Sequence, residues 1–471
     1  MFGVREVVKG VERSSDKGTK SQFAALEVRR KLEYGRLYLL FILHRLWFNL
    51  TKNRLLFWGG AITFSALLGA SLALITPLWS DPSTLNQFNK QAFVKTRSPA
   101  GLGGNGQYVL SRPVNILVMG IGPLPGVGDT SPSVFSRSSD TMLLLRLNPN
   151  TKFIRVLSIP RDSQVVIPGM GLTKISLANA SGGPVLAAQV VSRTLNNVPI
   201  DRYVRITTNA LRELVDLLGG VEVFVPQRMS YKDASQQLSI DLDPGWQTLN
   251  GDQAQQFARF RDSSTGDLGR IQRQQVLMKA LRDRLTHPTL LPLLPKLARM
   301  MQSYVDTNLS LPEILALVDF CVELDGQNFQ MVLLPGSLSR LSKDPSSYWL
   351  YPAGQNQVMG EYFGVYAPGI SQKTRSLSTL RIAVQNASGQ PNLSDRVAKY
   401  LKERGFENVY IVSDWPDIER QTEIIMQQGN LKAASELQKV LGLGNIEAAS
   451  TGDLKSHLTI RVGKDWKGLR H

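Results

Sequence analysis

Hydrophobic residues form one long uncharged run near the start of the chain. Residues 55–79, LLFWGGAITFSALLGASLALITPLW, contain no charged side chain, and about 20 such residues in a helix cross the hydrocarbon core of a bilayer. Trp58 and Trp79 bracket the run, while Lys52 and Arg54 flank only its N-terminal end. By the positive-inside rule that end stays in the cytoplasm. The pattern predicts one uncleaved transmembrane helix, because the apolar part of a signal peptide is shorter and lies nearer the N-terminus.

The segments on either side of the run differ in composition. Residues 1–54 hold twelve Lys and Arg against five Asp and Glu, which predicts a basic cytoplasmic tail. Within it, apolar residues 38–50 are interrupted by His44 and Arg45, so an interfacial helix is favoured over a second span. Residues 80–112 are rich in Pro, Gly, Ser and Asn and predict a linker. We expect the rest of the chain to lie outside the cytoplasm.

Short apolar strands and amphipathic helices then alternate, which predicts an α/β fold. Strands are expected at 115–121, 141–147, 153–159 and 221–225, and helices at 183–197 and 208–220. We expect one large domain at 113–370, with a core at 114–286, a mostly helical extension at 287–370 and a loop-like stretch at 343–369. A linker at 371–378 and a small α/β domain at 379–467 follow.

Composition excludes several kinds of site. Almost half of the net charge of +16, an excess of seven, lies in the tail, where it sets topology, so no nucleic-acid partner is expected. Cys321 is the single cysteine and no CxxC occurs, which excludes internal disulfides and a zinc site. His287 is the only histidine between residues 80 and 450, so a Ser-His-Asp or Cys-His catalytic set lacks its base.

Polar residues follow two of the predicted strands. RSSDT at 137–141 lies between the first two strands, and SIPRDS at 158–163 ends the third. Asp140 and Arg161 should therefore stand on a common edge of the sheet, where open α/β sheets bind ligands. A structural Asp–Arg pair in a turn is the alternative, and it is favoured for these two residues taken alone.

Two further arginines favour a ligand site over a structural Asp–Arg pair. Read as a strand, QFARFRD at 256–262 places Arg259 and Arg261 on one face. Like charges repel there unless an anion lies between them, and the guanidinium fork suits phosphate.

A helix is expected to follow this segment. Asp267 is its expected N-cap, with Arg270 in the first turn and Gln274 on the same face. The helix N-terminus and the arginines together predict a diphosphate site. The Asp140 carboxylate would repel a phosphate unless a divalent cation bridges the two groups.

The order of these segments resembles the LytR-CpsA-Psr family. The blocks from 114 to 286 read NILVMGI, RSSDTMLLLRLNP, VLSIPRDS, TKISLANASGGP, PIDRYVRI, LVDLLGGVEV, GWQTLNGDQAQQFARFRD and GDLGRIQRQQ. The region 379–467, with LRIAVQNASG and IRVGKDW, resembles the LytR-type C-terminal domain that often follows. The phrase TLNNVPIDRYVRITTNALRELVDLLGGVEVFVP is similar to cyanobacterial members, which is a weaker likeness.

The resemblance implies an extracytoplasmic, periplasmic three-layer α-β-α domain with a central mixed sheet, anchored in the inner or plasma membrane. It implies a phosphotransferase that takes a glycopolymer from a polyprenyl-diphosphate carrier and joins it to peptidoglycan through a phosphodiester, with Mg²⁺ or Mn²⁺ as cofactor. The metal-binding aspartate of the family falls on Asp140. Its diphosphate-binding residues fall on Arg161, Lys174, Arg259, Arg261, Arg270 and Gln274.

The chain departs from the family pattern at two places. Many members have aspartate after the first strand, as MGID or MGTD, where it helps hold the metal, and here MGIG puts Gly122 in that position. Either Asp129 replaces it, or metal affinity is weaker, or catalysis is lost. The common Asn-His after the lysine becomes Ser176 and Leu177, with Asn179 close by.

The expected mechanism is in-line attack by a sugar hydroxyl on the polymer-proximal phosphorus, with the arginines stabilising charge. Asp162 is the candidate base, or it only orients Arg161. The rival interpretation is a scaffold that binds glycan or lipid diphosphate without turnover. A membrane-tethered transcriptional regulator is less favoured, because the tail has no helix-turn-helix pattern. The oligomeric state is left open.

Overall fold

The computed structural model describes residues 93–95, 108–122, 132–233, 238–262, 265–285, 303–322, 324, 328–339, 347–367 and 379–466, all within one compact unit, 79–471. The predicted tail, the predicted span at 55–79 and the apolar segment at 38–50 lie outside these residues. None of the helices in the described part of the chain is both long and apolar enough to cross a bilayer.

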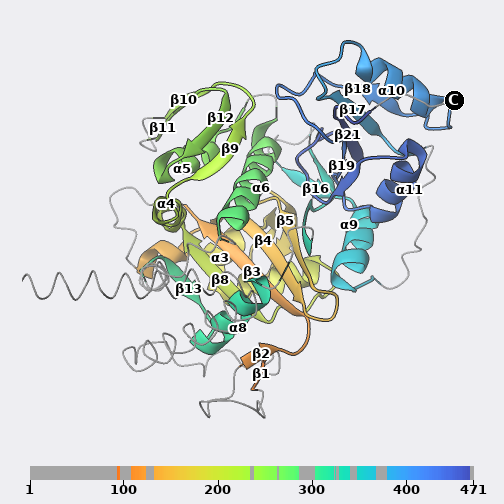
Figure 1. Cartoon of the computed structure of the whole chain (residues 1–471). Coiled ribbons are helices and arrows are strands. Elements are labelled where there is room, and N and C mark those ends of the chain that lie inside the picture. The colour runs from red at the N-terminus through yellow and green to blue at the C-terminus, as the bar shows by residue number, and fades with distance from the viewer. Residues whose placement is uncertain are drawn as a thin grey trace, which may run out of the picture. The chain divides into compact units, whose positions relative to one another are not determined.

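A six-stranded mixed sheet forms the centre of the large domain, in the order β13-β8-β3-β4-β5-β14 (Figure 1). Its strands are β3 (Val114–Ile121), β4 (Ser139–Asn148), β5 (Phe153–Ile159), β8 (Arg202–Thr207), β13 (Val305–Thr307) and β14 (Phe329–Leu333). β4 is antiparallel to both β3 and β5, whereas β3–β8 and β5–β14 are parallel pairs. The apolar runs predicted as strands at 115–121, 141–147 and 153–159 form β3, β4 and β5 in the middle of the sheet, where both faces are covered.

Helices cover both faces of this sheet. On one face α3 (Leu177–Thr194) packs in a core with Leu117 of β3. On the other, α8 (Leu311–Val322) places Leu317 against Ile116. Neighbouring residues of a strand point to opposite faces, so the two helices lie on opposite sides. The predicted α/β class with a central mixed sheet is confirmed.

Further strands and helices form a second core beside the sheet. These elements are α4 (Thr208–Leu217), β9 (Val221–Val225), β10 (Met229–Asp233), β11 (Leu238–Leu242), β12 (Gly245–Leu249), α5 (Gly251–Arg259) and α6 (Gly266–Leu285). β9 pairs with β12 and β10 with β11, both antiparallel. The helix predicted at 208–220 ends earlier, before Gly219 and Gly220, which have positive φ.

α5 corrects one prediction from the sequence. Asn250 accepts a hydrogen bond from the Gln253 N–H, and the Gln253 side chain accepts one from the Asn250 N–H. This capping box starts a helix, which continues through Arg259. The strand predicted at 256–262 is therefore wrong.

Two short hairpins lie beyond the end of β5. β6 (Gln164–Ile167) pairs with β7 (Gly171–Lys174), and β15 (Gly336–Leu338) pairs with β16 (Tyr348–Leu350). A backbone bridge between Ser163 and Tyr348 joins them. α9 (Pro352–Val358) and a π-helical turn, Met359–Phe363, follow and bury Val358 and Phe363 in the core of the sheet. The loop-like reading of 343–369 is thus wrong for 348–363, and the extension predicted as mostly helical also contains strands.

The C-terminal region has its own sheet and core. Five strands follow the order β18-β17-β21-β19-β20. The elements are β17 (Ile382–Asn386), α10 (Leu393–Lys402), β18 (Val409–Ile411), β19 (Glu423–Met426), α11 (Leu431–Leu441), β20 (Asn445–Glu447) and β21 (Leu458–Val462). The sequence pattern predicted this α/β character and missed β19 and β20. At the other end of the described chain, β1 (Phe93–Lys95) pairs with β2 (Tyr108–Leu110), and Phe93 and Leu110 are buried in a core with β3. The linker predicted at 80–112 is therefore wrong for these two segments.

Candidate functional site

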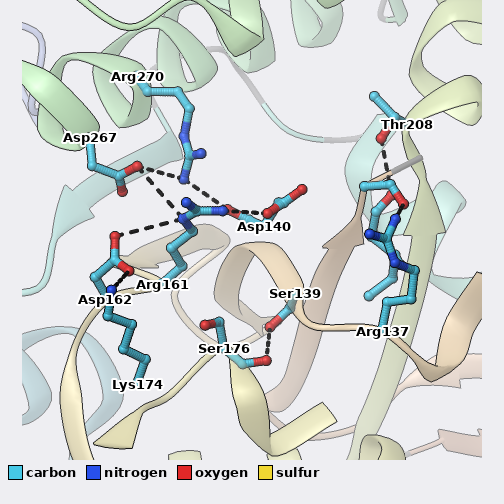
Figure 2. Close-up of polar contacts among 12 residues, drawn as sticks. Arg137, Ser139, Asp140, Arg161, Asp162, Lys174, Ser176, Thr208, Asp267 and Arg270 are labelled. Carbon is cyan, nitrogen blue, oxygen red and sulfur yellow. Dashed lines mark hydrogen bonds and ion pairs between the residues drawn. The ribbon is translucent and has the colours of Figure 1, made fainter. Parts of the chain in front are cut away.

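The predicted polar residues gather where β3 ends, β4 begins and β5 ends (Figure 2). Ser139, the first residue of β4, donates its N–H to the Ser176 carbonyl at 3.1 Å. Ser176 donates its own N–H to the Arg161 carbonyl at 3.1 Å. These two bonds fix the segments that carry Asp140 and Arg161 beside the start of α3.

Arg161 lies among three carboxylates. Its Nη1 is 2.5 Å from Asp140 Oδ1, and its Nε is 3.7 Å from Asp162 Oδ2 and 3.8 Å from Asp267 Oδ1. The Asp140 side chain is 46% exposed, whereas those of Asp162 and Asp267 are 9% and 12% exposed. The expected pairing of Asp140 with Arg161 is present, and Figure 2 shows Arg161 at the centre of the group.

The first turn of α6 supplies the other wall of the site. Asp267 is the second residue of this helix, so its predicted N-cap role is wrong. Its Oδ1 is 2.9 Å from Arg270 Nη2 and 3.6 Å from Arg261 Nη2. Arg270 also donates a hydrogen bond to the backbone carbonyl of Asp140 at 3.1 Å. Asp267 thus gathers three arginines, Arg161, Arg261 and Arg270, around one carboxylate.

Arg259 and Arg261 reach the site from the end of α5 and the segment after it. Their place there does not depend on the strand that the sequence wrongly predicted. Burial lowers the pKa of Arg259, and the charge of Asp140 acts in the opposite direction. Arg261 contacts Asp267 of the site, and Arg259 lies close enough to Asp140 and Asp233 for both charges to act on it.

Lys174 and Gln274 complete the predicted set. Lys174, at the end of β7, places its Nζ 3.1 Å from Asp162 Oδ1. Gln274 is half-buried on α6, one turn after Arg270. The structure therefore brings Lys174 to the site through Asp162, and it places Gln274 on the helix that supplies Arg270.

The charges in this cluster do not cancel. Five cations, Arg161, Lys174, Arg259, Arg261 and Arg270, face the carboxylates Asp140, Asp162 and Asp267, and the charge of Asp233 also acts on Arg259. Five positive against four negative charges leave a formal excess of one. Arg161 Nε and Arg270 Nε are buried, and neither makes a hydrogen bond within the described residues. Both carboxylate oxygens of Asp267 also lack a hydrogen bond there. Buried polar groups without partners are costly, and an anion with several oxygens would supply acceptors to the N–H groups.

A resident metal ion fits these residues poorly. Within the described ranges, no three His, Cys, Asp or Glu side chains are grouped to hold a metal. Asp140 is ion-paired with Arg161, and its Oδ2 lies 2.2 Å from where a Cβ on Gly122 would be. Asp129, the predicted substitute ligand, lies outside the described residues. The described donors would hold a divalent cation only together with oxygens from a bound phosphate.

Three residues here make contacts that the sequence did not predict. Asp267 was expected only as a cap, although a carboxylate one helical turn before Arg270 is a signal for an ion pair. Asn179 is buried and donates to the carbonyls of Phe135 and Arg137, so its role is to hold the turn before β4. Arg137 donates to the Gly122 carbonyl at 3.1 Å, which fixes the end of β3.

Diphosphate binding is expected to weaken as pH rises through about 10. Burial lowers the pKa of Arg270 to about 10, against the opposing charge of Asp267. An anion binds the charged form, so affinity is retained below this pKa and lost above it. Isothermal titration with a soluble diphosphate diester, whose own charge is constant here, measures the effect between pH 8 and 11. The additional loss near pH 10 should be absent from Arg270→Gln.

Two family models match this chain. The LytR_cpsA_psr family model matches residues 86–361, more than half of the chain. The model described as LytR cell envelope-related transcriptional attenuator matches residues 379–466.

Named relatives are found among curated proteins and solved structures. The Bacillus subtilis polyisoprenyl-teichoic acid–peptidoglycan teichoic acid transferase TagV is 30% identical over 52% of this chain and 62% of its own length. The probable cell wall biosynthesis protein LcpB of Corynebacterium glutamicum is 32% identical over 49% of this chain and 52% of its own. The crystal structure of B. subtilis TagV is similar at 28% identity and a TM-score of 0.46, and the match covers 55% of this chain and 99% of that chain. The chain thus spans less than two thirds of the length of these curated relatives.

Proposed function

The chain is a member of the LytR_cpsA_psr family, and on that basis we propose that it is a phosphotransferase that moves a glycopolymer from a polyprenyl-diphosphate carrier to peptidoglycan. One observation carries the proposal. Arg161, Arg261 and Arg270 converge on Asp267 at the edge of the sheet, and the cluster carries a net positive charge. A diphosphate diester carries the opposite charge and the acceptor oxygens that Arg161 Nε and Arg270 Nε lack.

The proposed reaction is a displacement at the phosphorus nearest the polymer. A hydroxyl oxygen of the acceptor forms a new bond to this phosphorus as the bridging bond of the diphosphate breaks. Polyprenyl phosphate leaves with that bridging oxygen, the hydroxyl proton passes to a base, and the polymer remains joined through a phosphodiester. Charge on the transferred and leaving phosphates rises during this step, and guanidiniums fixed around it stabilise that charge.

Each residue of the cluster has a distinct role in this proposal. Arg161, Arg259, Arg261 and Arg270 bind and neutralise the diphosphate. Asp267 positions three of these arginines. Asp162 orients Arg161 and Lys174, since its two oxygens already face both cations, and we retain it as the candidate base. A divalent cation, Mg²⁺ or Mn²⁺, bound between Asp140 and the phosphates would add charge neutralisation.

The membrane part of the proposal comes from the sequence. The uncharged run at 55–79 would anchor the chain in the membrane that holds the lipid carrier, with the domain after the linker on the extracytoplasmic side. This arrangement places a diphosphate site beside a lipid-linked substrate.

Transfer assays on the full chain in lipid nanodiscs test the proposal. With polyprenyl-diphosphate glycan and peptidoglycan oligomers supplied, we expect a glycan–peptidoglycan phosphodiester and free polyprenyl phosphate, detected by mass spectrometry. A protein that binds the diphosphate but releases neither product under varied divalent cation would refute the enzyme proposal.

The second candidate function is a scaffold that binds the carrier without turnover. The observation in its favour is that position 122, directly beside Asp140, is glycine and supplies no second carboxylate, while Asp140 is paired with Arg161. The transfer assay separates the two, because a scaffold retains diphosphate affinity and forms no product.

A further inference from the structure

The β6–β7 hairpin presents an apolar face to solvent directly beside the candidate site. Val166 and Leu172 are partners across the hairpin, and they are 70% and 59% exposed. Met170 in the connecting turn is 46% exposed. From Ser163 to Thr173 the chain contains no charged residue. The opposite face is packed, because Val165 and Ile167 are buried in the core of the sheet.

Exposed aromatic side chains continue this surface on β16. Tyr348 is buried and forms a backbone bridge to Ser163 at the base of the hairpin. Alternation then turns Trp349 outward, and Trp349 and Tyr351 are 42% and 43% exposed. We call Val166, Met170, Leu172, Trp349 and Tyr351 the apolar strip.

The apolar strip is continuous with the phosphate-binding cluster. Lys174 and Leu172 lie on the same face of β7, because they are two residues apart. Lys174 contacts Asp162, whereas Leu172 and Val166 lie farther toward the tip. Successive side chains on one face of a strand are about 7 Å apart. The hairpin therefore runs from charged groups at its base to aliphatic groups at its tip within roughly 10–15 Å.

We propose that the apolar strip inserts into the surface of the phospholipid bilayer and holds the diphosphate site at the level of the headgroups. A bilayer has the same order of layers as this hairpin, because its charged phosphates lie outside its hydrocarbon. Tryptophan and tyrosine favour the boundary between these two layers. The turn bonds its own backbone, since Met170 N–H donates to the Ile167 carbonyl, and Pro168 has no N–H to satisfy. The choice of a bilayer as occupant rests on the proposed function, because a lipid-linked diphosphate is reached only at that surface.

Chain connectivity is consistent with this occupant. Residues 80–92 separate the uncharged run at 55–79 from β1. Fully extended, a segment of that length reaches no more than about 45 Å. A domain joined to a membrane anchor by so short a segment stays near the bilayer surface, although the connection does not select which face touches it.

Site-directed fluorescence on the full chain tests the inference. Cys321 is replaced by serine, and Val166→Cys or Leu172→Cys is labelled with an environment-sensitive dye in nanodiscs that contain spin-labelled phospholipid. We expect the lipid-borne quencher to lower emission at these positions about twofold or more, with a blue shift relative to detergent. The matched control is Val318→Cys, on an exposed face of α8 in the same domain, where neither change is expected.

The remaining outcomes overturn the inference. Equal lipid quenching at Val166 and Val318 would show that no orientation exists. Shielding of Val166 from aqueous iodide without lipid quenching would mean that a protein partner or a second copy covers the apolar strip. Transfer activity is read separately on the same samples. Active protein without lipid quenching contradicts this inference alone, and quenched protein without transfer contradicts the proposed function alone.

Discussion

Replacing Arg270 by glutamine is expected to lower transfer by about a hundred- to a thousandfold, the range seen when one charge-stabilising donor is removed from an active site. The Arg270 side chain is 7% exposed and joins Asp267 to the backbone of Asp140. Its Nε–H is buried and has no hydrogen-bond acceptor within the described residues. Transfer and diphosphate affinity are measured on the full chain, and circular dichroism with thermal unfolding checks that it is folded.

Arg282→Gln is the matched control for this substitution. Arg282 is an arginine on the same helix α6, and its partner is Asp283 rather than a residue of the site. We expect nearly full transfer from Arg282→Gln. Arg270→Lys should recover part of the activity, because it restores the charge without the planar fork. Full activity in Arg270→Gln, or an equal loss in Arg282→Gln, would contradict the site assignment.

The parts of the fold that the sequence predicted well are those with apolar residues on both faces. β3 and the stretches 142–145 of β4 and 156–159 of β5 are mostly buried on both faces, so their apolar runs are easy to recognise. The hairpin β6–β7 was missed because only one of its faces is packed and the other is also apolar. Val166 and Leu172 point to solvent, so the alternation of apolar and polar residues that marks a half-buried strand is absent.

The sequence predicted that Asp140 and Arg161 lie at a common edge of the sheet, but it did not predict the local conformation of the segment that carries Arg259. Arg259 and Arg261 reach the cluster although the segment that carries Arg259 is helical. Either a strand or a helix end would turn Arg259 and Arg261 toward one anion. The capping box at Asn250, which makes the segment helical, lies nine residues before Arg259. The contacts of Asp267 required tertiary structure, because three arginines from separate segments meet only when α6 docks against the edge of the sheet.

Gly122→Asp is expected to create tighter binding of Mg²⁺, by about tenfold or more, because a second carboxylate would join Asp140. A Cβ at this position lies 2.2 Å from Asp140 Oδ2, so the Asp140 carboxylate must move and its ion pair with Arg161 weakens. Two adjacent carboxylates repel without a cation, so the metal-free variant should melt at a lower temperature than the wild type. Added Mg²⁺ should reverse this loss, since a ligand held at 100 times its Kd stabilises by about 2.7 kcal/mol.

Gly122→Asn separates charge from volume in this test. Asparagine displaces the Asp140 carboxylate to the same extent, but it adds no negative charge. The Mg²⁺-dependent rise in Tm should therefore be large in Gly122→Asp and small in Gly122→Asn, and equal rises would contradict a second carboxylate ligand. A wild-type rise as large as that of Gly122→Asp would show that the native metal site is already complete, with its other ligand outside the described residues. Asp129→Asn would then remove that rise if Asp129 is the ligand.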